Sequence, residues 1–266
     1  TFIVPTMLYA LIDHPATPEH DLSSLRALIY GASPASPARV REALERFGPV
    51  LVQTYGQTEA PNTILILDQQ AHQNASAEQL ASAGQPFPGL DVVLLGDDGQ
   101  PTANGETGEI CVKGPLLMSG YHGQPEQTER TLVDGYLRTG DLGRIGADGL
   151  FYIVDRKKDM IISGGFNIYP KEIEDVLSAH PEVAAVAVFG VPDPKWGEAV
   201  KAVVALKHGA TASPEQLIDY VRARKGAIHT PKSIELVDAV PVTSLGKPDK
   251  KSLRSRYWNQ QSREIA

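Results

Sequence analysis

The chain has 266 residues, a length that corresponds to about two domains. Its 32 acidic and 25 basic side chains give a formal net charge of −7, so a broad basic surface for nucleic acid is not expected. The single cysteine, Cys111, excludes an intrachain disulfide framework and a cysteine-rich zinc site.

No apolar run approaches the roughly 18 residues that a transmembrane helix needs. The opening TFIVPTMLYA lacks both an initiator Met and the basic region of a signal peptide. We therefore expect a soluble, cytoplasmic protein whose given chain starts partway through a longer one.

The first predicted elements form a strand–helix–strand unit. An apolar run over residues 25–30 leads into the loop GASP, and Ser36-Pro37 are typical of the start of a helix that ends near Phe47. A second apolar run over residues 50–54 leads into YGQTE. This spacing predicts two parallel strands, with both following loops at the carboxyl edge of the sheet, where open α/β sheets bind ligands.

The pattern changes after about Gly84 and again after a charged junction at residues 155–159. Short strand-like runs at 91–95, 109–113 and 150–154, separated by turns, predict an antiparallel sheet or small barrel. The last part combines expected helices at about 170–177 and 214–224 with strands at 183–188, 199–206 and 234–237, followed by a basic C-terminal helix. We expect domains at 1–85, 86–157 and 158–266.

Tyr55-Gly56-Gln57-Thr58-Glu59 is the first motif that could carry chemistry. Gly56 allows a close backbone approach to a ligand, the Thr58 hydroxyl can reach a phosphate oxygen, and one carboxylate from Glu59 can hold Mg²⁺. The alternative is an ordinary turn with a capping threonine.

Three later motifs follow in order: YLRTGDL at 136–142, DRKKDMIISGGFNIYP at 155–170 and PVTSLGK at 241–247. A carboxylate such as Asp141, held in a tight glycine turn, can accept both hydroxyls of a ribose, although a hairpin aspartate fits too. The glycine pair between two domains can act as a hinge or line a tunnel. Lys247 can supply a movable positive charge, although such a lysine alone is usually a solvated side chain.

Together and in this order, the four motifs resemble the adenylate-forming superfamily, in its acyl-CoA synthetase branch, from about Leu25 to Arg256. The resemblance implies α/β plus α+β architecture: part of a large N-terminal domain, with a βαβ layer and a small antiparallel β-barrel, and then a small α+β lid domain. It also implies an ATP-dependent, Mg²⁺-dependent ligase that joins a carboxylic acid to coenzyme A through an acyl-adenylate. A homodimer through the large domain is compatible with it.

Site residues carried over by the resemblance fall into six groups. Lys247, Thr58 and Glu59 are catalytic, with Glu59 as the metal ligand. Gly31, Ala32, Ser33, Tyr55, Gly56, Thr58, Asp141 and Arg156 bind the nucleotide. Lys158 is the hinge, Gly164, Gly165, Trp196, Lys225 and Lys232 bind CoA, and Tyr30, Gly31 and Gln57 belong to the acyl pocket.

One departure from the family is large. The Ser/Thr/Gly-rich phosphate loop, resembling YTSGTTGKPKG, is absent from these 266 residues, so binding of the β- and γ-phosphates by this piece is in doubt. We expect a C-terminal fragment of a longer enzyme or one piece of a processed chain.

The alternatives are an adenylation domain that loads a carrier protein, a luciferase-type oxygenase and a non-catalytic binding fragment. Nothing after Lys247 resembles a carrier domain, and no residue argues for an oxygenase. The missing phosphate loop favours the binding fragment, whereas retention of Glu59, Asp141 and Lys247 favours the enzyme. The sequence does not identify the acid.

Overall fold

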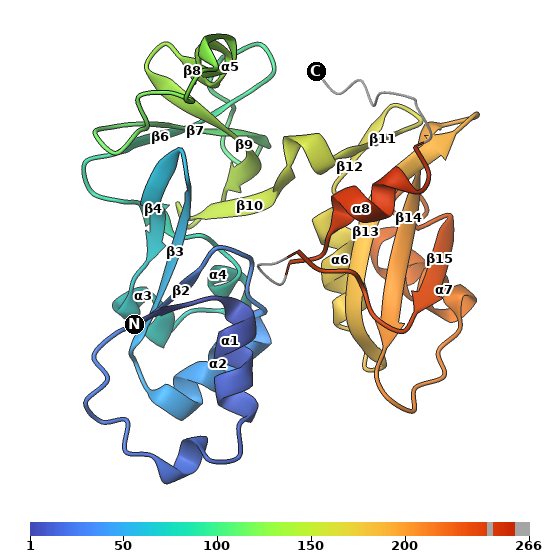
Figure 1. Ribbon diagram of the computed structural model, residues 1–266, viewed down its shortest axis with the longest axis horizontal. Coiled ribbons are helices and arrows are strands. Elements are labelled where there is room, and N and C mark those ends of the chain that lie inside the picture. The colour runs from blue at the N-terminus through green and yellow to red at the C-terminus, as the bar shows by residue number, and fades with distance from the viewer. Residues whose placement is uncertain (244–246, 259–266) are drawn as a thin grey trace. The chain divides into compact units, whose positions relative to one another are not determined.

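The computed structural model describes residues 1–243 and 247–258, and the chain divides into two compact units, Thr1–Ile153 and Val154–Ala266 (Figure 1). Each unit has its own sheets and apolar clusters. The predicted division at 85/86 and 157/158 stays a prediction.

Unit 1 begins with a five-stranded sheet in the order β1-β2-β3-β4-β5. Its strands are β1 (Phe2–Ile3), β2 (Leu28–Gly31), β3 (Leu51–Gln57), β4 (Ala60–Leu67) and β5 (Gln85–Pro86). The first three are parallel, and α2 (Pro37–Phe47) connects β2 to β3, which confirms the predicted strand–helix–strand unit. β4 and β5 are antiparallel additions that the apolar runs did not predict.

Helices α1 (Pro5–Asp13) and α2 share an apolar cluster with this sheet. Leu8 and Ile12 of α1 and Val40 and Ala43 of α2 are buried, as expected for one face of each helix. A 3₁₀ turn at Thr17–Glu19 lies between α1 and β2. The short helices α3 (Gln69–Gln73) and α4 (Ala77–Leu80) lie between β4 and β5.

The second sheet has the order β10-β9-β7-β6, with β8 paired to β9, so the predicted antiparallel sheet is present as an open sheet. Its elements are β6 (Asp91–Leu95), β7 (Gly108–Lys113), α5 (Pro125–Thr131), β8 (Leu132–Val133), β9 (Tyr136–Ile145) and β10 (Phe151–Arg156). Ile110, Val112 and Leu137 pack with Ile64 and Leu65 of β4 in one apolar cluster. This cluster joins the two sheets of unit 1.

Unit 2 contains a mixed sheet in the order β12-β11-β14-β13, with β15 paired parallel to β14. Its elements are a 3₁₀ turn at Lys157–Asp159, β11 (Ile161–Ser163), β12 (Phe166–Ile168), α6 (Pro170–Ser178), β13 (Val183–Asp193), β14 (Gly197–Leu206), α7 (Pro214–Lys225), β15 (Ser233–Val237) and α8 (Lys250–Ser255). The predicted α+β pattern is confirmed.

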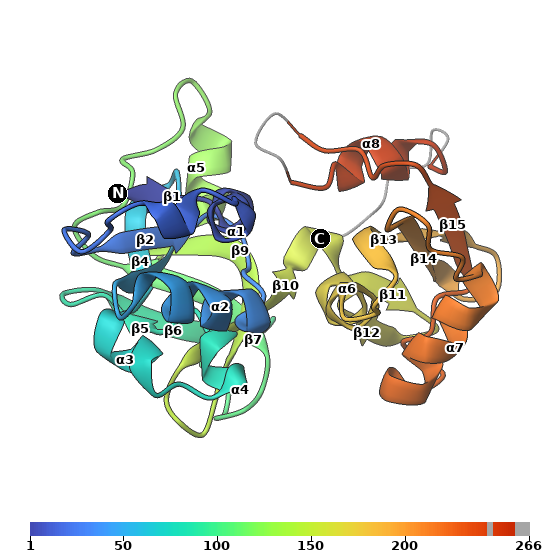
Figure 2. The ribbon, with the colours of Figure 1, turned by 90° about the horizontal axis from the view of Figure 1, so that it is seen from below.

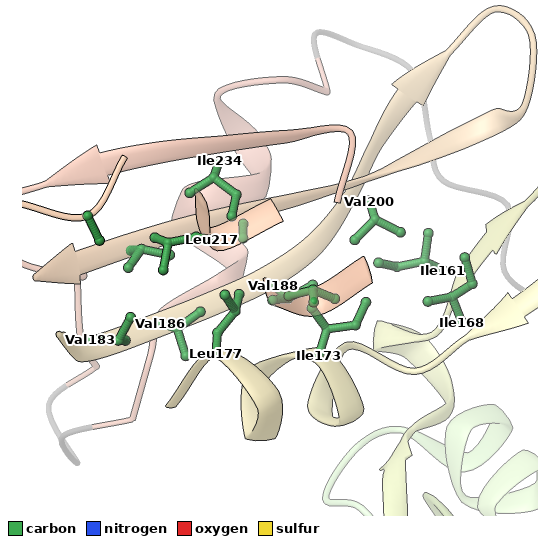
Figure 3. Close-up of a cluster of buried hydrophobic side chains, with 14 residues drawn as sticks. Ile161, Ile168, Ile173, Leu177, Val183, Val186, Val188, Val200, Leu217 and Ile234 are labelled. Atoms are coloured by element: carbon green, nitrogen blue, oxygen red, sulfur yellow. The ribbon is translucent and has the colours of Figure 1, made fainter. Parts of the chain in front are cut away.

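Alternating residues of β13 face opposite sides of this sheet, because successive strand side chains point in opposite directions. Val186 and Val188 pack with α6 and α7, in the cluster drawn in Figure 3. Ala187 and Phe189 pack with Leu253 of α8 on the other side. Figure 2 shows the resulting layers, with α8 on one face of β13 and β14 and α6 and α7 on the other.

Within the described ranges, 1–243 and 247–258, no helix is long and apolar enough to cross a membrane.

Candidate functional site

The GASP loop follows β2 at the carboxyl end of the parallel strands, as predicted. Gly31 lies opposite Thr54, and a Cβ on Gly31 would meet the Thr54 carbonyl oxygen at 2.3 Å. Only glycine therefore lets the two strands approach this closely. Ala32 then adopts φ +68°, a left-handed conformation, and leads into Ser33. The register places this turn next to the strand segment that carries Tyr55.

Tyr55 and Asp141 come together although they are 86 residues apart. The Tyr55 hydroxyl donates to Oδ2 of Asp141 at 2.7 Å, linking β3 of the first sheet to β9 of the second. Asp141 is 8% exposed. Two of the four motifs thus meet in a single hydrogen bond.

The sequence analysis placed YGQTE in a loop and Asp141 in a tight glycine turn, and both interpretations were wrong for the residues that lie in strands. Tyr55, Gly56 and Gln57 lie within β3, and Asp141 lies within the ten-residue strand β9. The pairing register shifts between Tyr55 and Gln57 in one case, and opposite Glu109 and Cys111 in the other. The extra residues lie in β9 itself around Asp141, whereas in the first sheet they lie in β4, where residues 61–64 face the single residue Gly56 of β3. Such irregularities redirect side chains without ending a strand.

Three hydrogen bonds hold the bulge around Asp141. Gly140 has φ +71°, and its N–H donates to Oε1 of the buried Glu109 at 3.1 Å. The Thr139 hydroxyl donates to the Ile110 carbonyl at 2.7 Å and accepts from the Asp141 N–H at 3.1 Å. These bonds fix the backbone that presents the Asp141 carboxylate. Sequence reasoning did not identify Glu109, and a lone glutamate in a strand gives no signal of such a role.

Thr58 and Glu59 form the two-residue turn between β3 and β4. Thr58 is exposed, and Glu59 accepts a hydrogen bond at Oε1 from the Tyr121 hydroxyl at 2.8 Å. Partial burial and the Glu59 carboxylate raise the pKa of Tyr121, so its hydroxyl stays protonated and can donate. Tyr121 was also missed from sequence, because it lies 62 residues from its partner.

Glu59 is suited to a metal that is shared with phosphates. No group of three or more His, Cys, Asp or Glu side chains gathers within the part of the chain that the structure describes. Mg²⁺, however, is usually bound by one or two carboxylates together with phosphate oxygens and water. Oε2 of Glu59 lies beside the tyrosine-bound oxygen, so the single carboxylate fits Mg²⁺ arriving with a nucleotide.

Tyr30 and Gln57, two residues expected in the acyl pocket, differ in burial. The Tyr30 side chain is fully buried in the cluster beneath α1 and α2, where its hydroxyl is 2.9 Å from Nε2 of His72 and 3.2 Å from Oε1 of Gln53. Gln57 is partly buried at the end of β3. Gly56 faces protein backbone, since a Cβ there would meet the Asn62 carbonyl oxygen at 2.7 Å.

The charged junction begins unit 2. Arg156 ends β10 and has an exposed side chain, and Lys158 is exposed within the 3₁₀ turn that follows. The hinge role of Lys158 and the nucleotide contact of Arg156 stay predictions.

Gly164 and Gly165 are the two central residues of the β11–β12 hairpin, with φ +58° and +82°. Two positive φ values are those of a type I′ turn, which favours glycine. The Trp196 ring lies against this turn, because a Cβ on Gly164 would meet its Cε3 at 2.7 Å. Trp196 is 41% exposed.

Two lysines lie near this tryptophan. Lys195 Nζ is 4.7 Å and Lys232 Nζ is 5.9 Å from the ring centroid. The structure thus brings together Gly164, Trp196 and Lys232, and adds Lys195, which sequence reasoning did not select. Lys225 ends α7, where its Nζ lies 3.4 Å from Oε2 of Glu172.

Lys247 lies just before α8 and is partly buried. Its carbonyl accepts from the Thr243 N–H at 2.7 Å, and its own N–H donates to the Thr243 hydroxyl at 3.3 Å. Residues 244–246 of the PVTSLGK motif lie outside the described residues.

Two family models match this chain: AMP-binding enzyme over residues 1–122, and AMP-binding enzyme C-terminal domain over residues 172–247. The chain belongs to the adenylate-forming, AMP-binding enzyme family. This assignment agrees with the mixed α/β and α+β architecture and with the resemblance drawn from the four motifs.

Similar proteins include a medium/long-chain-fatty-acid–CoA ligase of Mycobacterium tuberculosis, 49% identical over 100% of this chain and 47% of its own length. A feruloyl-CoA synthase of Amycolatopsis sp is 46% identical over 96% of this chain and 51% of its own. Among solved structures, an amide bond synthetase from Marinactinospora thermotolerans matches with a TM-score of 0.89 at 45% identity, covering 96% of this chain and 51% of that one. The chain therefore spans about half the length of these relatives.

Proposed function

We propose that this chain provides the nucleotide-holding and lid parts of an AMP-forming acid–CoA ligase. The hydrogen bond between Tyr55 and Asp141 carries the proposal, because it unites two motifs that the resemblance assigns to one nucleotide. The names of the relatives, two of which are acid–CoA ligases, support the same activity.

The first proposed step joins the acid to AMP. A carboxylate oxygen attacks the α-phosphorus of ATP, the bond to pyrophosphate breaks, and an acyl-adenylate forms. Asp141 accepts hydrogen bonds from the ribose hydroxyls, and Arg156 adds a contact beside them. The turn at Gly31, Ala32 and Ser33, with Tyr55 and Gly56, frames the adenine, and Thr58 donates to the α-phosphate.

Lys247 supplies positive charge where two anions meet. A carboxylate and a phosphate repel each other, so a cation whose interaction strengthens in the transition state accelerates their reaction. Glu59 is the proposed holder of Mg²⁺, which when bound neutralises phosphate charge.

The second proposed step transfers the acyl group. The CoA sulfur attacks the acyl carbon, the bond to AMP breaks, and the thiol proton passes to solvent. Gly164, Gly165 and Trp196 line the path of the pantetheine, and Lys225 and Lys232 pair with CoA phosphates. The exposed Trp196 ring flanked by two lysines supports this assignment, since aromatic and cationic groups suit a phosphorylated nucleotide.

Several parts of the proposal rest on the resemblance more than on contacts. Lys158 is the hinge for lid rotation, and Tyr30, Gly31 and Gln57 contribute to one wall of the acyl pocket. We also propose that the enzyme is cytoplasmic and that it forms a homodimer through the large domain. Light scattering of the purified protein tests the homodimer.

The test is AMP release from ATP by the natural gene product, including any sequence before Thr1, over fatty and aromatic acids. We expect release that requires both acid and CoA, and a loss of about 10²- to 10³-fold in Lys247→Ala, the usual effect of removing one charge-stabilising group. Lys251→Ala, which changes an exposed lysine four residues away, is the matched control.

Other results would redirect or reject the proposal. Pyrophosphate exchange without CoA-dependent turnover would favour a carrier-protein acceptor, or an amine, as the similarity to an amide bond synthetase allows. No acid-dependent use of ATP under any condition would leave the binding fragment.

A further inference from the structure

A cluster of charged side chains is packed within unit 2, apart from the proposed site residues. Lys250 Nζ lies 2.8 Å from Glu174 Oε1, and Arg254 Nη2 lies 2.6 Å from Asp159 Oδ1. All four side chains are only 17–19% exposed. Together with the buried Asp155 they form what we call the α8 charge cluster.

The α8 charge cluster joins segments that are far apart in sequence. Asp155 and Asp159 belong to the junction, Glu174 to α6, and Lys250 and Arg254 to α8. Oε1 of Glu174 also accepts the Val188 N–H at 2.7 Å, which satisfies a backbone donor of β13, the last strand in the sheet order. The pair Lys250–Glu174 therefore bridges α8 and α6 past this edge of the sheet.

The charged forms of Asp159 and Lys250 are favoured in the folded protein, whereas burial raises the pKa of Asp155. Burial opposes the charged form of Asp159, but Arg254 and Lys250 outweigh it, so the pKa of Asp159 lies below its usual range. Burial also opposes the charged form of Lys250, and the carboxylates of Glu174 and Asp155 outweigh it, so the pKa of Lys250 is raised. Removing one member would leave a buried charge without its partner, which is costly.

Helix α8 depends on such contacts for its position. It has six residues, well below the length at which an isolated helix is stable in water. Leu253 holds one side of it against Ala187 and Phe189, and the charge cluster holds Lys250 and Arg254. The apolar contact resists separation from the sheet, whereas the directional ion pairs resist rotation and sliding.

The connection from α8 to Lys247 is short and stiff. Only Pro248 and Asp249 lie between them. Pro248 has a ring-fixed φ and forms a β-bridge with Val242. The Asp249 N–H donates to the Pro241 carbonyl at 2.8 Å, and its side chain accepts the Ser252 N–H at 3.0 Å as the N-cap of α8. A displacement of α8 is therefore passed on to Lys247.

We propose that Lys250 and Arg254 are positioning residues for Lys247: their ion pairs with Glu174 and Asp159 hold α8, and α8 holds the backbone of the lysine. The inference rests on the proposed function, because it assumes that Lys247 acts in adenylate formation. It adds that the junction residue Asp159 helps to set the position of the lysine, 88 residues later in the chain.

The first arm of the test is independent of activity. Amide hydrogen exchange is measured in wild type, Arg254→Gln and Lys251→Gln, the last changing an exposed neighbour on the same helix. We expect exchange of the α8 amides to rise about tenfold or more in Arg254→Gln alone, because local opening is governed by such contacts. Unchanged protection of α8 in Arg254→Gln would overturn the inference.

The second arm separates the two half-reactions in the natural gene product. In Arg254→Gln and Lys250→Gln we expect kcat for acid-dependent ATP–pyrophosphate exchange to fall about tenfold or more, since small displacements of a catalytic group have effects of this size. The KM for ATP and the rate of CoA attack on supplied acyl-adenylate should stay within about twofold, because Lys247 is assigned to the first step only. Lys250→Arg and the charge swap Asp159→Arg with Arg254→Asp should recover part of the loss.

A general loss of structure would reduce both half-reactions together and would not be recovered by the swap, and that outcome would overturn the inference. Unchanged pyrophosphate exchange would overturn it as well. A wild-type enzyme that shows no acid-dependent exchange contradicts the proposed function instead, while the amide-exchange arm still shows whether the cluster holds α8.

Discussion

The two units hold their proposed site residues, the nucleotide-binding Asp141 and the catalytic Lys247, by different means. In unit 1, Asp141 lies inside a ten-residue strand, and its backbone is fixed by Thr139 and Glu109 within a few residues of it in the sheet. In unit 2, Lys247 lies outside the sheet, before a six-residue helix held by the apolar contacts of Leu253 and by two ion pairs. Asp141 is thus part of a sheet, whereas Lys247 is connected to the sheet of unit 2 through α8.

This difference matches what each group has to do under the proposal. A ribose contact needs a fixed position, which strand pairing provides. A lysine that acts in one step and is then withdrawn needs a carrier that moves as a body, and the proposed rotation of the lid at Lys158 provides one. Within the lid, α8 has to hold the lysine in place. Substitutions far from Lys247 in the sequence should therefore change its position more than they change that of Asp141.

The largest expected effect is on the apolar attachment of α8. Leu253→Ala should lower the free energy of unfolding of unit 2 by about 2–5 kcal/mol, because it removes a fully buried side chain. Urea unfolding followed by tryptophan fluorescence reports this unit alone, since both tryptophans, Trp196 and Trp258, belong to it.

Lys251→Ala serves as the control for Leu253→Ala and should change the free energy of unfolding little. A loss in Leu253→Ala below about 1 kcal/mol would mean that the ion pairs alone hold the helix, contrary to the comparison drawn above.

The next effect concerns the carboxylate in the strand. Asp141→Asn should raise the KM for ATP about 10- to 100-fold, because hydrogen bonds to a charged group contribute about 1.5–3 kcal/mol. Stability should change little, since the bonds that form the bulge come from the backbone, Thr139 and Glu109.

Tyr55→Phe is the matched comparison for Asp141→Asn, because it removes only the hydroxyl that donates to Asp141. Its effect on the KM for ATP should be smaller. An unchanged KM in Asp141→Asn, with a normal calorimetric transition, would reject the nucleotide contact.

The smallest expected effect is a pH dependence confined to unit 1. The His72 ring is 1% exposed, and burial lowers its pKa below the ordinary value of about 6.5. Nδ1 lies 2.6 Å from the Asp68 carbonyl, which can only accept, so Nδ1 carries the proton in the neutral ring.

Protonation of His72 favours the unfolded state, in which the pKa is higher. Its contribution to stability is present above about pH 6.5 and is lost as the pH falls toward the lower pKa of the folded state, by up to about 1.4 kcal/mol per pH unit. Urea unfolding followed by far-ultraviolet circular dichroism should show a shallower slope between pH 5.5 and about 7 in His72→Gln. The same slope in both proteins would contradict the burial effect.

The strand–helix–strand unit, the antiparallel sheet and the α+β pattern were predicted from apolar runs and turn residues, and the structure confirms them. The additions β4 and β5 were not predicted, because the first half of Ala60–Leu67 contains Pro61 and Asn62, which are typical of a turn, and Gln85–Pro86 is only two residues long. The strand segments around Gly56 and Gly140 were interpreted as a loop and a tight turn, because a glycine beside polar residues can mark either a turn or an irregular strand.

The order of the four motifs determined the family of this protein and named the residues that the proposal uses, because each motif combines glycines and charged groups within one short segment. The tertiary structure alone decided that Tyr55 meets Asp141, that Tyr121 holds Glu59 and that the junction reaches α8. Those contacts join residues 62 to 95 positions apart, and such distances are closed only when sheets pack and buried charges find partners.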